Sequence, residues 1–409
     1  MKIQSFDWKD FLMGLQYLFV ASGATILVPI LTGIPVSVCL FSAGVGTIIF
    51  HLITKGKMPV LLSSSFAFIA PIIAVSETYG MQFAAGGIMV AGLVYLLLAM
   101  IIYFIGLDFI LKLFPTTVTS TMVILIGLIL APVAISNAST NWPIAIATFT
   151  FGALIKGFFD EHIFGSLSVI LAIILGFLIA IPFGIVDLSS VATASIIALP
   201  DFTLPKFSIE AILIIAPVAI VTFLEHFADV SAVSKVVDKN FLENPGVHKT
   251  LLGDGLATSF AGLIGGCPNT TYSENIGALE MTGVKKPVTL QITAVFLIVL
   301  ALLPKLAMIL HAIPAAVVGG ISILLFGMIS ANGVKSLVSE RVDMKNFHNM
   351  VIVASMLIIG AGGTVVDMFG IEFSSLAVAA LTGILLNLIF NFKEIFNFKE
   401  IFNFDHPIR

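Results

Sequence analysis

Charged residues are scarce in this sequence. Of its 409 residues only 10% are Asp, Glu, Lys or Arg, whereas 59% are hydrophobic and the mean hydropathy is +1.14. This composition predicts a polytopic membrane protein and argues against a soluble enzyme. The net charge of −4 indicates little about partners, because the few charges lie in loops. No nucleic-acid partner is expected.

Cysteine is nearly absent as well. Cys39 and Cys267 are the only two in the chain, so the sequence predicts neither a disulfide framework nor a metal site. No cofactor is expected. No cleavable signal peptide is predicted, because residues 2–10 are mixed in charge and the apolar run from Phe11 continues into a full span.

Apolar runs long enough to cross a membrane follow one another through the chain. A run of about 17 to 25 residues crosses roughly 30 Å of hydrocarbon. The fourteen predicted spans are residues 11–31, 36–54, 58–76, 82–106, 118–136, 142–155, 164–186, 208–234, 250–266, 269–282, 288–303, 314–330, 347–368 and 373–391. The sixth and the tenth are short. The predicted fold class is therefore an all-α membrane protein.

The distribution of Lys and Arg supports an even number of spans. With the N-terminus in the cytoplasm, all nineteen Lys and Arg residues except Lys206 and Lys305 fall on the cytoplasmic side. Cytoplasmic loops carry an excess of these residues, and a missed span would scramble the pattern downstream of it. We therefore expect a multi-pass protein of the plasma membrane with both termini in the cytoplasm.

Fourteen spans divide into two sets of seven, and a repeat with an odd number of spans must insert its second copy upside down. Two faint similarities fit this arrangement. Leu-Gln-Tyr at 15–17 resembles Leu-Glu-His at 224–226, and Ser/Thr-rich interruptions at 63–68 and 269–273 occupy the third span of each half. Paired broken spans at matching positions indicate the midplane binding site of a transporter.

The second interruption, residues 267–277, places hydroxyls, an amide and a carboxylate at membrane depth. Such groups are tolerated only where they face protein or a water-filled cavity. A helix that begins there would aim unpaired N–H groups at that cavity. Glu274 has a second interpretation, because Thr271 to Glu274 fits a capping box in which the carboxylate caps its own helix.

Glu225 lies well inside a predicted span, where a charged carboxylate costs about 2.5 to 3.5 kcal/mol. Asp229 is four residues further on and shares its helix face. Two buried carboxylates so close seldom both ionise, so the pair predicts a proton-carrying site. His226 is interpreted as a helix-packing residue. Asp254 is either a proton-relay or gating group or the cap of its own helix.

Several motifs resemble those of the nucleobase-ascorbate transporter family, which contains the uracil and xanthine permeases. They are Pro-Asn-Thr-Thr-Tyr-Ser-Glu-Asn-Ile-Gly at 268–277, Gln-Tyr-Leu-Phe at 16–19, Gly-Ala-Thr-Ile-Leu-Val-Pro at 23–29, Ser-Ser-Phe-Ala-Phe-Ile-Ala-Pro at 64–71, Glu-His at 225–226 and Pro-Gly-Val-His at 245–248. The resemblance runs from about residue 8 to 390. It implies two inverted repeats of seven spans, short antiparallel β-strands in broken spans three and ten, and transport usually driven by protons.

The resemblance also implies a division into domains. A core domain would comprise spans one to four (8–107) and eight to eleven (206–312), and a gate domain spans five to seven (108–205) and twelve to fourteen (313–391). Residues 392–409, which contain the tandem repeat Asn-Phe-Lys-Glu-Ile-Phe, would form a cytoplasmic tail. A homodimer is left open.

Site residues are carried over position by position. The resemblance implies that Glu225 and Glu274 hold a nucleobase and that Phe66 and Tyr272 flank it, with Ser273 and Ala24 beside them. It also implies proton coupling through Glu225, for which Asp229 and Asp254 are further candidates. Asp229 stands where uracil permeases often have His, and Phe326 where they often have Tyr.

These observations predict a proton symporter that imports uracil. A symporter of xanthine or another purine base is the alternative, because Asp229 resembles the xanthine branch. An anion exchanger of related fold is disfavoured by the two carboxylates, and a channel would lack saturable binding. A membrane-embedded enzyme is not expected, because the sequence contains no nucleophile–base pair or metal-ligand cluster. Coupling to sodium instead of protons is left open.

Overall fold

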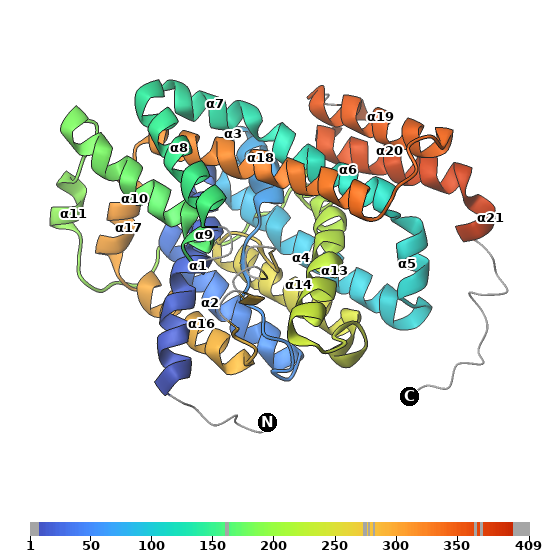
Figure 1. The fold of residues 1–409 in the computed structure, drawn as a ribbon, viewed down its shortest axis with the longest axis horizontal. Helices are drawn as coiled ribbons and strands as arrows, with labels where there is room; N and C mark the ends of the chain where they lie inside the picture. Colours follow the sequence, from blue (N-terminus) through green and yellow to red (C-terminus); the bar gives the residue numbers. More distant parts are fainter. Residues whose placement is uncertain are drawn as a thin grey trace.

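The computed structural model describes residues 8–159, 163–272, 276, 279–280, 283–363, 366–368 and 371–395. Helices dominate the described part of the chain (Figure 1). The first half contains α1 (Trp8–Thr32), α2 (Val36–Ile53), β1 (Ser63–Ser64), η1 (Phe66–Phe68), α3 (Ile69–Thr78), α4 (Met81–Ile105), α5 (Leu107–Leu113), α6 (Thr116–Ile129), α7 (Ala131–Ser139), α8 (Trp142–Phe158), α9 (Ile163–Ser166), α10 (Ser168–Ala180), η2 (Ile181–Phe183) and α11 (Ser189–Thr193). The second half contains α12 (Ile209–Ile215), α13 (Val218–Val237), η3 (Leu242–Gly246), α14 (Val247–Ile264), β2 (Asn269–Thr270), α16 (Pro287–Ala301), α17 (Pro304–His311), α18 (Ala315–Ser339), α19 (Phe347–Ala361), β3 (Val366–Met368), β4 (Ile371–Phe373), α20 (Ser375–Phe390) and α21 (Phe392–Ile395).

By length and composition, six of the described helical segments can cross a membrane, or up to seven if the bent pair α16 and α17 is one span. Others, among them α8, α10, α19 and α20, are apolar but shorter. The chain is thus a multi-pass membrane protein. The count of fourteen spans stays a prediction.

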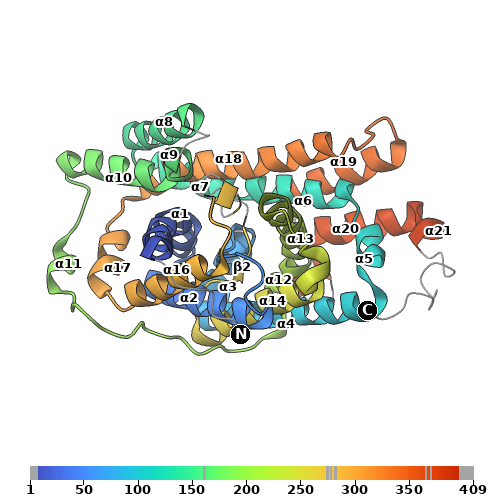
Figure 2. The same ribbon diagram turned by 60° about the horizontal axis from the view of Figure 1, so that its bottom comes forward.

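The helices pack into two groups, which Figure 2 shows on opposite sides of the molecule. We call the first the strand-bearing group; it consists of α1, α2, α3, α4, α12, α14 and α16. The second, the α18 group, consists of α6, α7, α8, α10, α18, α19 and α20. Helix α13 lies between them and contacts both α4 and α6. The family resemblance implies that these segments belong to a core and a gate domain, and both this division and the movement of the groups as two bodies stay predictions.

Glycine allows close approach within the strand-bearing group. A Cβ atom on Gly92 of α4 would lie 2.4 Å from the backbone nitrogen of Ser259 in α14, and one on Gly262 would lie 2.3 Å from that of Met89. Both distances are shorter than any ordinary contact. The two helices therefore pack backbone to backbone, as small residues permit in membranes.

The two Ser/Thr-rich interruptions meet as a pair of strands. β1 and β2 are antiparallel, with Ser63 opposite Thr270 and Ser64 opposite Asn269. They occur in the segments where the family resemblance implies short strands. A second antiparallel pair, β3 and β4, joins α19 to α20.

Hydroxyl groups of the neighbouring helices bind three of the polar groups around the first strand pair. Thr47 of α2 accepts a hydrogen bond from the backbone nitrogen of Leu62 (2.9 Å), and Thr258 of α14 donates one to the carbonyl of Asn269 (2.7 Å). The side chains of Thr25 in α1 and Ser63 share a bond of 2.7 Å. Because hydrocarbon satisfies no hydrogen bond, these helices provide the partners that two-residue strands need at membrane depth.

Candidate functional site

A cavity of about 190 Å³ lies where the strand pair, α13 and the α18 group meet. Its volume is below the roughly 300 Å³ at which pockets for drug-sized ligands begin, so it suits a small solute. One wall comes from the strand-bearing group and from α13, and the other from α6 and α18. The cavity therefore lies on the boundary between the two helix groups.

Helix α13 presents two carboxylates to this cavity. Glu225 and Asp229 both line it, as expected for residues one helical turn apart. Asp229 is buried and Glu225 is partly exposed. Ala228, which also lines the cavity, is exposed. The cavity is thus open enough for solvent to reach the acidic face of α13.

Two aromatic residues lie beside the strands. Phe66, the first residue of η1, and Tyr272, two residues after β2, both line the cavity. The ring of Phe66 contacts that of Phe326 in α18 edge to face, with centroids 6.3 Å apart. This contact joins the strand-bearing group to the α18 group at the edge of the cavity.

The α18 group contributes small polar residues to the opposite wall. Thr119 and Ser120 of α6 and Asn332 and Ser336 of α18 line the cavity. Ser120 donates a hydrogen bond of 2.8 Å to Ser336, which ties the two helices together. No sequence pattern marks these residues, because Ser, Thr and Asn are also ordinary helix-packing residues in membranes.

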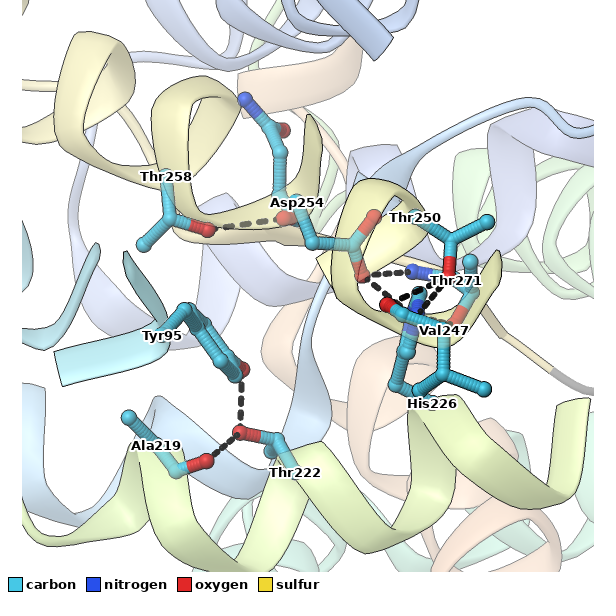
Figure 3. A network of polar contacts seen from close by, with 10 residues as sticks. Tyr95, Ala219, Thr222, His226, Val247, Thr250, Asp254, Thr258 and Thr271 are labelled. Atoms are coloured by element: carbon cyan, nitrogen blue, oxygen red, sulfur yellow. Dashed lines mark hydrogen bonds and ion pairs between the residues drawn. The ribbon is translucent and has the colours of Figure 1, made fainter. Parts of the chain in front are cut away.

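Behind the cavity, His226 connects three segments of the chain (Figure 3). Its Nδ1 lies 2.9 Å from a carboxylate oxygen of Asp254 and 3.2 Å from the hydroxyl of Thr271, and its Nε2 lies 2.9 Å from the hydroxyl of Thr250. The same Asp254 oxygen accepts a 3.1 Å hydrogen bond from the backbone nitrogen of Thr271. Tyr95 and Thr222 form a separate hydrogen bond between α4 and α13.

The interpretation of His226 as a packing residue fits this geometry, because its buried ring holds α13 against α14 and against the segment that follows β2. The helical pattern indicates that this side chain faces away from Glu225, but it does not predict a carboxylate of α14 as its partner. The structure places His226 and Asp254 in a fully buried hydrogen-bonded pair. The cap interpretation of Asp254 is wrong, because this residue lies inside α14, seven residues after Val247.

The hydroxyl of Thr250 has two possible acceptors. It donates its one hydrogen either to the carbonyl of Val247 at 3.0 Å or to Nε2 of His226 at 2.9 Å. In the first case Nε2 donates to the Thr250 oxygen, and in the second case Nε2 accepts. Thr250 therefore serves as a partner for either tautomer of the His226 ring.

The remaining predicted residues differ in their placement. Asp254 is buried behind the cavity and does not line it. Ala24 is buried in α1 next to Thr25, which binds β1, and is not among the lining residues that the structure describes. Ser273 and Glu274 lie outside the described residues. Among the described residues, Phe66, Tyr272, Glu225 and Asp229 are the predicted residues that share the cavity.

Comparison with known proteins agrees with this architecture. The model of a family described as "Permease family" matches residues 9–369. The chain is 40% identical over 393 residues to the uracil permease of Bacillus caldolyticus, covering 92% of this chain and 91% of that one. It is 39% identical over 404 residues to the uracil permease of Bacillus subtilis (strain 168), covering 94% and 92%. The solved transmembrane domain of a cyanobacterium bicarbonate transporter, BicA, superimposes with a TM-score of 0.65 at 18% identity, covering 93% and 96%, which shows a shared fold.

The His226–Asp254 pair predicts coupled effects on stability. We expect His226→Leu to lower the free energy of unfolding by about 3–5 kcal/mol, because it leaves the Asp254 carboxylate buried without its partner. Adding Asp254→Asn to His226→Leu should cost little more, because residues in one network are not additive. The measurement is the thermal midpoint of the protein purified in detergent. His311→Leu, at an exposed histidine of α17, is the control. A double variant destabilised by the full sum of the two single effects would contradict the coupling.

Proposed function

The chain belongs to the permease family that includes the uracil permeases, and from this premise we propose that it imports uracil by proton symport. The observation that carries the proposal is the convergence of Glu225, Asp229, Phe66 and Tyr272 on one small cavity between the two helix groups. We assign transport, and not catalysis, to this site.

The chemistry of the cavity suits a flat heterocycle. The N–H groups of uracil alternate with carbonyl groups around one edge of the ring. A carboxylate such as Glu225 accepts hydrogen bonds from N–H groups, whereas hydroxyls such as those of Ser64 and Ser65 can donate to carbonyls. Phe66 and Tyr272 offer apolar surface to the faces of the ring. A base with a different pattern would leave buried polar groups unpaired, which is the basis of strong rejection.

Protons would enter through the acidic face of α13. Glu225 and Asp229 are one turn apart, so protonating one of them relieves the repulsion between the two carboxylates. His226, on the same helix, lies directly behind these carboxylates and binds Asp254 of α14. In the proposed cycle Glu225 takes up a proton from outside, uracil binds, and both leave on the cytoplasmic side. A membrane potential contributes about 2.3 kcal/mol per 100 mV for each charge moved.

The conformation fits the inward-facing state of such a cycle. Thr119 and Ser120 lie near the start of α6, and Asn332 and Ser336 lie near the end of α18. In the predicted topology both of these helix ends are cytoplasmic. Asn332 is exposed, so the cavity is accessible from the cytoplasmic side of the α18 group. We assign the strand-bearing group to the moving core and the α18 group to the gate.

Uracil is favoured over xanthine by the named relatives, which are uracil permeases at 35% to 40% identity. Asp229 is the position at which this chain resembles the xanthine permeases instead. A bicarbonate transporter shares the fold, but the carboxylates in this cavity would repel an anion.

Competition for uptake tests the substrate. In cells or vesicles that contain the protein, we expect excess unlabelled uracil to abolish uptake of radiolabelled uracil, and xanthine, hypoxanthine, adenine and thymine to compete more weakly. Uptake should increase as the external pH is lowered, because more of the carrier is then protonated on the outside. Stronger competition by xanthine than by uracil would move the assignment to a purine base.

Glu225→Gln tests proton coupling. The amide retains the shape of the side chain but cannot carry the proton, so we expect accumulation of uracil against its gradient to be abolished, with the internal concentration no higher than the external one. Glu243→Gln, at an exposed carboxylate in η3, is the matched control and should accumulate uracil normally. Full proton-driven accumulation by the Glu225 variant would remove Glu225 from the coupling mechanism.

A further inference from the structure

A second cavity, distinct from the one described above, lies on the other side of α1 from the strand pair. It is a groove of about 270 Å³ between α1, α2 and α16 of the strand-bearing group and α10 of the α18 group, with α17 along it. Every lining residue among those whose side chains the structure describes is apolar or glycine. The walls come from both helix groups, as do those of the substrate cavity, but these described side chains offer no group that could bind a polar solute.

The groove opens to the outside of the molecule at membrane depth. Phe19, Ile174 and Leu178 line it and are 51%, 47% and 54% exposed. They lie in the first and seventh predicted spans, so they face hydrocarbon and not water. Gly23 also lines the groove, and a Cβ atom there would only touch Val169 of α10 at 3.6 Å. The absence of a side chain at Gly23 keeps the space between α1 and α10 open.

Helix α17 adds an amphipathic border. It is bent by 83° from α16, so it does not continue through the membrane with that helix. Leu306, Ile309 and Leu310 line the groove at helical spacing, whereas Lys305 and His311 are exposed. An apolar face toward hydrocarbon with polar residues outside it is typical of a helix that lies in the membrane interface.

An empty apolar space of this size is unfavourable, because its lining loses the contacts that close packing would provide. Water does not fill such a space; an apolar cavity of about 150 Å³ stays dry and binds apolar molecules instead. The cube root of 270 Å³ is roughly 6 Å, whereas a helix with its side chains is about 10–12 Å across. A helix of a second copy is therefore too wide, and a slender unbranched chain fits.

We propose that this groove is a binding site for one acyl chain of a membrane phospholipid, held between the two helix groups, with its headgroup at the interface that α17 marks. Lipid binding does not depend on the proposed substrate. If the groups move against each other as proposed above, the bound chain fills the changing space between α1 and α10.

Retained lipid tests the site. The protein purified in detergent is stripped of loosely bound lipid, and the phospholipid that remains is counted by native mass spectrometry. We expect Gly23→Leu, which fills the groove, to retain one phospholipid fewer per chain than the unmodified protein. Gly157→Leu is the matched control, because Gly157 is exposed in α8 and has open space around it. Equal retention by the Gly23 variant, or no retained lipid on the unmodified protein, would overturn the proposal.

Photo-crosslinking tests the same site by a second route, which identifies the occupant. With p-benzoylphenylalanine in place of Leu310, illumination of the protein in membranes should yield a phospholipid adduct that survives detergent stripping. The same group in place of Leu97, at an exposed position of α4, gives the amount of phospholipid adduct that general lipid contact produces. An adduct with a second copy of the chain at position 310, or no more phospholipid adduct there than at 97, would also overturn the proposal.

Discussion

Backbone groups cannot remain without hydrogen bonds inside a bilayer, and the site of this protein depends on how that constraint is met. Two spans are broken at membrane depth, and each break leaves N–H and carbonyl groups that their own helices cannot satisfy. β1 and β2 satisfy one another as an antiparallel pair. Hydroxyl groups from α1, α2 and α14 surround the pair. The same arrangement brings the residues next to the strands, Phe66 and Tyr272, to one cavity.

Helix α13 links this strand pair to the second helix group. One side of α13 presents Glu225 and Asp229 to the cavity. His226, which follows Glu225 in the chain, points away from the cavity and binds Asp254 of α14. Because Asp254 also accepts from the backbone of Thr271, the ion pair fixes the position of β2 relative to α13. The segment that carries Tyr272 is thereby tied to the helix that carries Glu225.

The sequence predicts the acidic residues of the cavity and the broken spans beside it, because charge at membrane depth and Ser/Thr-rich breaks in apolar runs have few explanations other than a site. The aromatic residues Phe66 and Tyr272 were implied by the family resemblance. Glu225 and Asp229 follow from helical spacing alone. The antiparallel strands were implied by family resemblance, since two-residue strands leave no periodic signal. Thr119, Ser120, Asn332 and Ser336 could not be predicted, because small polar residues also serve ordinary helix packing. The partner of His226 lies 28 residues away on another helix, at a distance that no local pattern encodes.

The central claim is that the solute binds between the strand pair and the α18 group. The most direct measurement is the rate at which a thiol reagent alkylates Asn332→Cys, because Asn332 is on the α18 side of the cavity and the native Cys39 and Cys267 are fully buried. We predict that saturating uracil slows this alkylation several-fold and leaves the alkylation of Gly157→Cys in α8 unchanged. An Asn332→Cys protein that binds uracil and yet is alkylated at the same rate with and without it would contradict the account.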